Sequence, residues 1–168
     1  PSVAGCGGAG GGLSGLLPRS GGGKLLVGGS GGRLGAALVR CPGDDCEVRG
    51  LTRAQLDLAN LDQVASILGA LDFDVLVNCA AQTNVDRCEE KPAEAVAINA
   101  AGPERLAQLC AEKKAQLIHI STDYVLHGEQ REPYPEADKA KPIGVDGQAK
   151  AGGERGGWGV GAGKAAGR

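Results

Sequence analysis

A glycine cluster stands between an apolar run and an Ala/Leu stretch in the segment KLLVGGSGGRLGAAL, residues 24–38. This order predicts a strand, a tight turn and a helix, which together open a βαβ unit. Gly29, Gly32 and Gly35 have the spacing G-x-x-G-x-x-G. Because the first N–H groups of a helix have no partner within it, such a turn presents backbone donors to an anion. The strand before the turn and the helix after it favour a dinucleotide site here over an ordinary glycine-rich turn.

Length, charge and cysteine spacing limit the other possibilities. The 168 residues suffice for one domain, and a formal net charge of -2 gives no electrostatic reason to expect nucleic acid or an anionic membrane as a partner. No apolar run approaches the roughly 18 residues of a bilayer-spanning helix. The six cysteines form no C-x-x-C pair, so we expect reduced thiols and no metal site. We expect a cytoplasmic location, with organelle import as the alternative because residues 1–43 contain no Asp or Glu.

Glycine is concentrated at the two ends of the chain. Residues 1–23 contain 10 of the 30 glycines and residues 151–168 contain 8. Segments of this composition bury little apolar surface. We therefore predict a glycine-rich disordered flank at 1–23, an NAD(P)-binding Rossmann domain at 24–150 and a glycine-rich disordered tail at 151–168.

The corner after the second expected strand indicates the cofactor. The first helix is expected to end near Arg40, and residues 46–51 are expected to form the second strand. Residues just past that strand meet the adenosine ribose in a dinucleotide fold, where an acid binds the ribose hydroxyl and a basic residue accommodates a 2′-phosphate. The corner here reads Thr52-Arg53, without an acid. Arg53 therefore favours NADP, with NAD as the alternative, unless this side chain is merely solvated.

Helices and strands alternate through the rest of the chain, which predicts an α/β fold of the Rossmann type with a doubly wound parallel sheet. Ala80 and Ala81 follow the third strand and leave room for a flat cofactor, while the polar residues 121–124 follow the fourth strand. The expected elements are a helix over 60–71 with Asn60 as its cap, a buried strand over 74–78, a long helix over 92–113 that Gly102-Pro103 interrupts, and a strand over 116–121.

Four segments of the chain read GGSGGRLG, LTRAQLDL, VNCAAQTNVDRCEEKPAEAVAINA and HISTDYVLHG. In this order and spacing they resemble the extended short-chain dehydrogenase/reductases, and within them the dTDP-4-dehydrorhamnose reductase group. The similarity covers about residues 24–154, and its Ala-Ala-x-Thr-x-Val-Asp and Ser-Thr-Asp-Tyr-Val stretches are specific. The regulatory beta subunit of methionine adenosyltransferase resembles the chain in the same motifs.

The resemblance implies a role for each matching residue. Thr122, with Asp123 beside it, matches the catalytic and substrate-contacting position, and Asn99 matches an asparagine that braces the site. Lys150 matches the lysine of the family's Tyr-x-x-x-Lys motif and would bind the nicotinamide ribose. The other implied cofactor contacts are Gly29, Arg33, Leu34 and Gly35 at the diphosphate, Asp57 and Leu58 at the adenine, and Ala80, Ala81, Gln82 and Thr83 beside the middle of the cofactor.

Two departures from the family pattern affect the expected activity. Asp146 stands at the catalytic position of the tyrosine, which is the acid that protonates the substrate oxygen as hydride arrives. A phenol titrates near 10 and a carboxyl near 4, so Asp146 beside Lys150 would be ionised unless its pKa is raised strongly. Proteins of the family also continue further, so we expect a fold truncated before most of the substrate domain. Glycines after Lys150 are expected to break the helix that carries it.

The resemblance leaves two functions open. The first is NADPH-dependent reduction of a 4-keto-6-deoxy nucleotide sugar, for which we expect little turnover because the family's catalytic tyrosine is missing. The second is a non-catalytic NADP-binding regulatory subunit. The expected partners are therefore a nucleotide-sugar substrate, a second copy of the chain in a homodimer, or a regulated partner subunit, with neither nucleic acid nor membrane.

Overall fold

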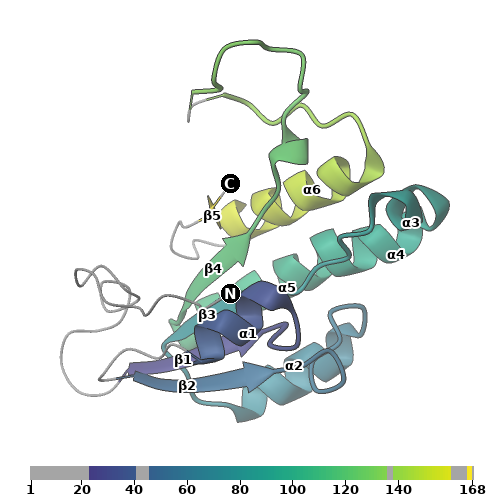
Figure 1. Cartoon of the computed structure of the whole chain (residues 1–168). Helices are drawn as coiled ribbons and strands as arrows, with labels where there is room; N and C mark the ends of the chain where they lie inside the picture. Colours follow the sequence, from purple (N-terminus) through teal and green to yellow (C-terminus); the bar gives the residue numbers. More distant parts are fainter. Residues whose placement is uncertain (1–22, 41–45, 136–137, 160–165, 168) are drawn as a thin grey trace, which may run out of the picture.

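A parallel sheet with helices on both faces forms the centre of the structure (Figure 1). The computed structural model describes residues 23–40, 46–135, 138–159 and 166–167. The flank expected at 1–23 lies outside the described residues except for Gly23, and so do Cys6 and Cys41. The elements are β1 (Gly23–Gly28), α1 (Arg33–Arg40), β2 (Cys46–Leu51), α2 (Leu61–Ala70), β3 (Val75–Asn78), α3 (Val85–Glu90), α4 (Pro92–Val96), the π-helical turn η2 (Ala97–Ala101), α5 (Gly102–Lys113), β4 (Gln116–Ile120), the 3₁₀ turn η3 (Asp123–Val125), α6 (Val145–Gly159) and β5 (Ala166–Gly167).

Within the described residues the strands lie in the order β2-β1-β3-β4-β5, and each neighbouring pair is parallel. The chain runs from β1 to β2 at one edge, returns past β1 to β3, and then continues to β4 and β5. Leu25 of β1 pairs with Val48 of β2 on one side and with Val75 of β3 on the other. The prediction of a doubly wound parallel sheet is confirmed. Its strand order reverses between β1 and β3, and open α/β sheets bind ligands at the carboxyl ends of the strands beside such a point.

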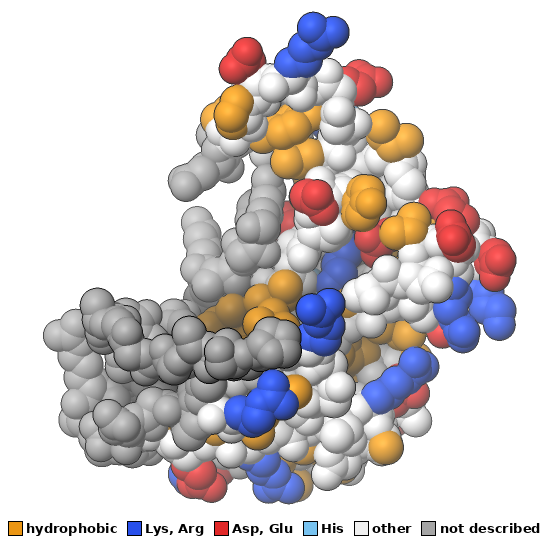
Figure 2. All heavy atoms as spheres, in the orientation of Figure 1, with side chains coloured by type: hydrophobic (Ala, Val, Ile, Leu, Met, Phe, Trp, Pro, Cys, Tyr) orange, Lys and Arg blue, Asp and Glu red, His pale blue; other side chains and the backbone are white. Residues whose placement is uncertain are grey.

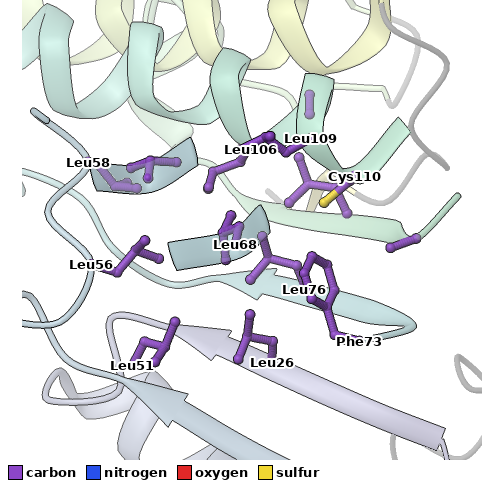
Figure 3. Packing of buried hydrophobic residues seen from close by; sticks show 14 of the residues in the cluster. Leu26, Leu51, Leu56, Leu58, Leu68, Phe73, Leu76, Leu106, Leu109 and Cys110 are labelled. Carbon is purple, nitrogen blue, oxygen red and sulfur yellow. The ribbon is translucent and has the colours of Figure 1, made fainter. Parts of the chain in front are cut away.

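Successive side chains of β1 face two different layers of helices, because neighbouring residues of a strand point to opposite faces. Leu26 belongs to the larger apolar cluster, in which Leu68 of α2 and Leu106 of α5 cover the sheet (Figure 3). Leu25 and Val27 belong to a second cluster, against which residues of α1 pack. Helices on both faces therefore hold the central strands in place and leave the carboxyl ends of the strands for the site.

The helix expected over 92–113 is interrupted by the π turn η2, which ends at Ala101, directly before the Gly102-Pro103 pair at which the sequence predicts the interruption. Pro103 has no N–H, so it cannot donate to the carbonyl of Asn99 as an α-helix requires. The N–H of Gly102 instead donates to the carbonyl of Ala97, which widens the turn. This turn carries Asn99, whose side chain is fully buried at 0% exposure.

Helix α6 extends through residues that the composition assigned to a disordered tail. It runs from Val145 to Gly159, whereas the sequence predicted the domain to end at residue 150 and the helix to break soon after Lys150. Gly153 and Glu154 are both buried. The expected end of the helix is therefore corrected, because packing against neighbouring elements overrides the low helix propensity of glycine. The short elements α3 and η3 were not predicted from the sequence.

Candidate functional site: a cavity at the strand ends

A cavity of about 460 Å³ lies at the carboxyl ends of β1, β2 and β3. Its wall combines the turn after β1, the corner after β2 and the small residues after β3. Since the strand order reverses between β1 and β3, the cavity lies where an open α/β sheet is expected to bind its ligand. The lining residues are Gly29, Gly31, Gly32, Thr52, Arg53, Ala54, Leu56, Asp57, Leu58, Cys79, Ala80, Ala81 and Ile98.

Backbone hydrogen bonds and close packing shape the turn after β1. The N–H groups of Gly29 and Ser30 donate to the carbonyl of Leu51 at 2.9 and 3.0 Å, which ties the turn to β2. Gly29 has a φ of +76°, and a Cβ there would lie 2.7 Å from the backbone nitrogen of Ala80, so only glycine fits. A Cβ at Gly35 would overlap the carbonyl oxygen of Gly29. The two glycines therefore let β3 and α1 approach the turn closely.

The N-terminal end of α1 has the properties of an anion site. Gly31 and Gly32 line the cavity and directly precede Arg33, the first residue of the helix. A Cβ added at Gly31 would meet no atom within 4 Å, so the space over the turn is open. The first turn of α1 contains no acidic residue. Free N–H groups and the positive end of the helix dipole suit this position to a diphosphate.

Side-chain contacts fix the corner after β2, where the adenosine half of a dinucleotide is expected. Gln55 Oε1 accepts a hydrogen bond from the N–H of Thr52 at 2.9 Å and another from the Thr52 hydroxyl at 3.0 Å. The N–H of Asp57 donates to Gln63 Oε1 at 2.9 Å. Arg53 lies between these contacts, is exposed, and lines the cavity. Its guanidinium is therefore available to a ligand.

Asn99 connects the loop after β3 with helix α6. Its Oδ1 accepts from the N–H of Gln82 and its Nδ2 donates to the carbonyl of Gln82, both at 2.9 Å. The same Nδ2 lies 3.3 Å from Asp146 Oδ1. Asn78, at the end of β3, acts on the same loop, because its Oδ1 accepts from the N–H of Ala80 at 3.1 Å. Two buried amides thus hold the segment that borders the cavity.

The residues expected to be catalytic lie directly after β4 and in the first half of α6. Lys150 Nζ donates to the carbonyl of Ile120, the last residue of β4, at 3.0 Å. The hydroxyl of Thr122 donates to Asp123 Oδ1 at 3.2 Å. Asp146 lies one helical turn before Lys150 in α6, and the two side chains are 6% and 5% exposed. Asn99 connects Asp146 to the loop after β3 that borders the cavity.

Burial changes the ionisation of these groups. Burial raises the pKa of the Asp146 carboxyl, Lys150 acts against this change, and Asp123 acts with it. Burial also lowers the pKa of the Lys150 ammonium, which the carboxylates of Asp146 and Glu154 oppose. Burial, together with Lys150, lowers the pKa of His119 to about 4. The imidazole is therefore neutral at pH 7.

The described residues contain neither a metal cluster nor a membrane-spanning helix. No group of three His, Cys, Asp or Glu side chains among them could hold a metal ion. None of the helices in the described ranges has the length and apolar character needed to cross a bilayer. Acidic side chains (red) and basic side chains (blue) are interspersed on the face that Figure 2 shows.

Residues 23–156 match the family described as the RmlD substrate binding domain. The match spans well over half of the chain and includes every segment that lines the cavity. The chain belongs to this family.

Several relatives of this RmlD-family chain are named as reductases. A dTDP-4-dehydrorhamnose reductase of Mycolicibacterium smegmatis is 39% identical over 134 residues, which are 79% of this chain and 40% of that protein. A crystal structure of dTDP-4-dehydrorhamnose reductase from Bacillus anthracis in complex with NADP has a TM-score of 0.79 and 29% identity, covering 83% of this chain and 50% of that one. The corresponding structure from Clostridium acetobutylicum has a TM-score of 0.78 and 36% identity, covering 82% and 49%. The chain thus spans about half or less of the length of these relatives.

The structure of this RmlD-family chain brings together only part of the predicted cofactor residues. Arg33 and Leu34 are exposed at the start of α1, and Gly35 is buried beneath the turn. Gln82 and Thr83 lie beyond the lining of the cavity, and Lys150 lies at the junction of β4 and α6. The predicted residues that line the cavity are Gly29, Gly32, Arg53, Asp57, Leu58, Ala80 and Ala81.

Sequence reasoning assigned no role to several residues that shape the site. Asn78 ends a buried strand, and a polar residue at that position was the available signal. Gln55 holds the N–H of Thr52 within the corner after β2. Glu89 acts on a distant segment, because it accepts a hydrogen bond from the N–H of Val145 at 2.8 Å. Glu154 lies in the segment predicted to be a disordered tail. Composition alone gave no signal for Glu89 or Glu154.

Proposed function

We propose that this chain is the NADP-binding part of a reductase that acts on a 4-keto-6-deoxy nucleotide sugar, as dTDP-4-dehydrorhamnose reductase does. The observation that carries the proposal is the cavity beside the glycine turn, together with the NADP complex of the Bacillus anthracis relative. The residues fit a dinucleotide, because the space over Gly31 is open and no acid stands in the first turn of α1. NAD is the alternative cofactor.

Each part of the cavity has a role in binding. The diphosphate lies over the turn at Gly29 and Gly32, where the first N–H groups of α1 are its donors. The N–H groups of Gly29 and Gly32 themselves donate to the carbonyls of Leu51 and Gly29. Arg53 receives the 2′-phosphate, because a guanidinium binds phosphate oxygens through paired hydrogen bonds. Ala80 and Ala81 leave space beside the sheet for the flat part of the cofactor. The remaining contacts are those that the resemblance assigns to Arg33, Leu34, Gly35, Asp57, Leu58, Gln82 and Thr83.

Bound NADPH would supply the hydride that reduces the keto carbon. Thr122 binds the substrate oxygen, with Asp123 beside it as a second substrate contact, and Lys150 orients the cofactor through its ribose. Asp146 stands where the acid is required, but its carboxyl is shorter than a phenol and accepts a hydrogen bond from buried Asn99. When ionised it adds negative charge near an oxygen that is itself becoming negative. We therefore propose that hydride transfer is impaired in this chain.

Cofactor binding can be tested by titrating the chain with NADPH and NADH and following nucleotide fluorescence. Arg53→Ala should weaken NADPH binding by about tenfold and leave NADH binding within about twofold, because only NADPH carries the 2′-phosphate. Arg49→Ala is the matched control, since Arg49 is an exposed arginine of β2 that does not line the cavity. The proposed function is refuted if neither NADPH nor NADH binds.

Impairment can be tested by restoring the acid. Asp146→Tyr should raise the rate of NADPH oxidation with dTDP-4-keto-6-deoxy sugar by about 100-fold, the usual contribution of a general acid. Asp146→Asn is the control, because it removes the charge without supplying a phenol. If neither variant is faster than the unaltered chain, residue 146 does not limit turnover. If both variants are equally faster, the charge of Asp146, and not the missing phenol, limits it.

A second candidate function is a non-catalytic NADP-binding regulatory subunit resembling the methionine adenosyltransferase beta subunit. The observation that favours it is a cofactor cavity beside an altered acid position, with Asp146 where the family has tyrosine. Mixing the chain with a methionine adenosyltransferase catalytic subunit and measuring co-elution, with and without NADPH, tests this candidate. Separate elution under both conditions would reject it.

A further inference from the structure

Helix α6 carries a row of three buried ionisable side chains. Asp146, Lys150 and Glu154 follow one another at intervals of four residues, so they share one face of the helix. Their exposed fractions are 6%, 5% and 5%. The proposed function uses Asp146 and Lys150 but gives no role to Glu154. A buried carboxyl is retained only with partners, so its contacts indicate what it does.

Glu154 and Lys150 hold two successive residues at the end of β4. The hydroxyl of Ser121 donates to Glu154 Oε1 at 2.5 Å. Lys150 Nζ donates to the carbonyl of Ile120 at 3.0 Å. The next residue along the chain is Thr122. The course of the chain from β4 to Thr122 therefore depends on these two contacts with α6.

Close packing fixes the depth at which α6 carries Glu154. A Cβ at Gly153 would lie 2.5 Å from the carbonyl oxygen of Asn99 and 3.4 Å from His119 Nε2. The backbone of α6 thus lies directly against η2 and β4, at the residue before Glu154. Because the helix cannot move closer, the carboxyl of Glu154 reaches the strand end from a fixed distance.

Glu154 also supplies negative charge beside Lys150. The other groups that face Lys150 are Asp146 on the same helix, Cys79 after β3 and His119 in β4. His119 is neutral at pH 7, and burial raises the pKa of the Cys79 thiol. Asp123 of η3 faces Asp146. The two carboxyls of α6 are therefore the counter-charges available to the ammonium.

We propose that Glu154 is a positioning residue of the site. Its carboxylate holds Lys150 as an ammonium at the end of β4, and its hydrogen bond with Ser121 fixes the segment that leads to Thr122. The use of Lys150 in cofactor binding rests on the proposed function, whereas the ionisation and placement of Lys150 can be measured without any cofactor.

The test is a direct titration of Lys150 by NMR in the full chain labelled with ¹³Cε-lysine, with the signal assigned by Lys150→Arg. Glu154→Gln keeps the size of the side chain and an oxygen that accepts from Ser121, but removes the charge. We expect the pKa of Lys150 to fall by about one pH unit, as for the loss of a nearby opposite charge. Glu104→Gln, in an exposed position of α5, is the matched control and should leave Lys150 unchanged. An unchanged pKa of Lys150 in Glu154→Gln overturns the proposal.

Further variants separate charge from packing. Glu154→Asp restores a carboxylate and should return the pKa of Lys150 toward its value in the unaltered chain, which a purely structural role would not do. The effect of Glu154→Gln should persist in an Asp146→Asn background. If Glu154→Gln does not fold, ¹³Cδ-glutamate labelling of the unaltered chain decides. The ¹³Cδ signal of Glu154 must then shift as Lys150 loses its proton, and a signal that does not move overturns the proposal.

The outcomes for the site and for the proposed function remain distinct. If the unaltered chain binds neither NADPH nor NADH, the proposed function fails while the Lys150 titration still tests the role of Glu154. If NADPH binds and Glu154→Gln leaves the titration of Lys150 unchanged, the role of Glu154 alone is rejected.

Discussion

Asn99 illustrates how one buried side chain organises this site. Its amide makes two hydrogen bonds with Gln82 and a third with Asp146, so it satisfies both of its polar atoms inside the protein. An unpaired amide at this depth would be strongly unfavourable. Asn99 thereby couples the loop that borders the cavity to the helix that carries Lys150. Asp146 depends on the same contact, because its carboxyl is buried beside Asn99.

The carboxyl of Asp146 makes stability depend on pH. Burial raises its pKa in the folded state, so the folded chain holds this proton where the unfolded chain has already lost it. This contribution to stability is present at low pH and is lost as pH rises through the folded-state pKa. Asp146→Asn should therefore unfold less readily than the unaltered chain at pH 7. The difference should shrink as pH falls toward about 4, the ordinary carboxyl value.

Urea unfolding between pH 3 and pH 8 measures this effect. Asp86→Asn is the control, since Asp86 is exposed, and it should change the free energy of unfolding by no more than about 0.5 kcal/mol. If Asp146→Asn raises the free energy of unfolding by the same amount at every pH, titration of the Asp146 carboxyl is not the cause.

Helices and strands were predicted best where local sequence is sufficient. The second strand has the predicted bounds, and Asn60 caps α2 by accepting from the N–H of Gln63 at 3.0 Å. The start of α6 is different, because its cap comes from another element. Glu89 of α3 accepts the N–H of Val145 at 2.8 Å, over a separation of 56 residues. No local pattern around Val145 reports that contact.

Removal of this cap should destabilise the chain. Glu89→Ala leaves the first N–H of α6 without its carboxylate and should lower the free energy of unfolding by about 1 kcal/mol, a typical helix-cap value. Glu89→Gln keeps an accepting oxygen and should recover part of this loss. Chemical denaturation of both variants, with the neighbouring exposed Glu90→Ala as control, measures the difference. Equal stability of Glu89→Ala and Glu90→Ala would mean that the contact contributes nothing.

The molecule as a whole is held by the apolar layer between the sheet and helices α2 and α5 (Figure 3). Leu68 lies inside this layer at 0% exposure, whereas Ile143 is 69% exposed. Leu68→Ala should lower the free energy of unfolding by about 2–5 kcal/mol, because it removes buried methyl groups and leaves a cavity. Ile143→Ala is the control and should change it by no more than about 0.5 kcal/mol. Thermal and urea unfolding compare the two, and similar losses would place the core elsewhere.

Local sequence alone determined the strand, turn and helix around Gly29, because an apolar run, a glycine spacing and a helical period all act over a few residues. The alternation that follows determined the parallel sheet, and small residues after β3 indicated the cavity. Tertiary structure alone decided that α6 continues past residue 150, since Gly153 and Glu154 are held by contacts with η2 and β4. It also decided the partners of Asn99 and Glu89, because burial and hydrogen bonding between distant segments depend on how the chain folds back on itself.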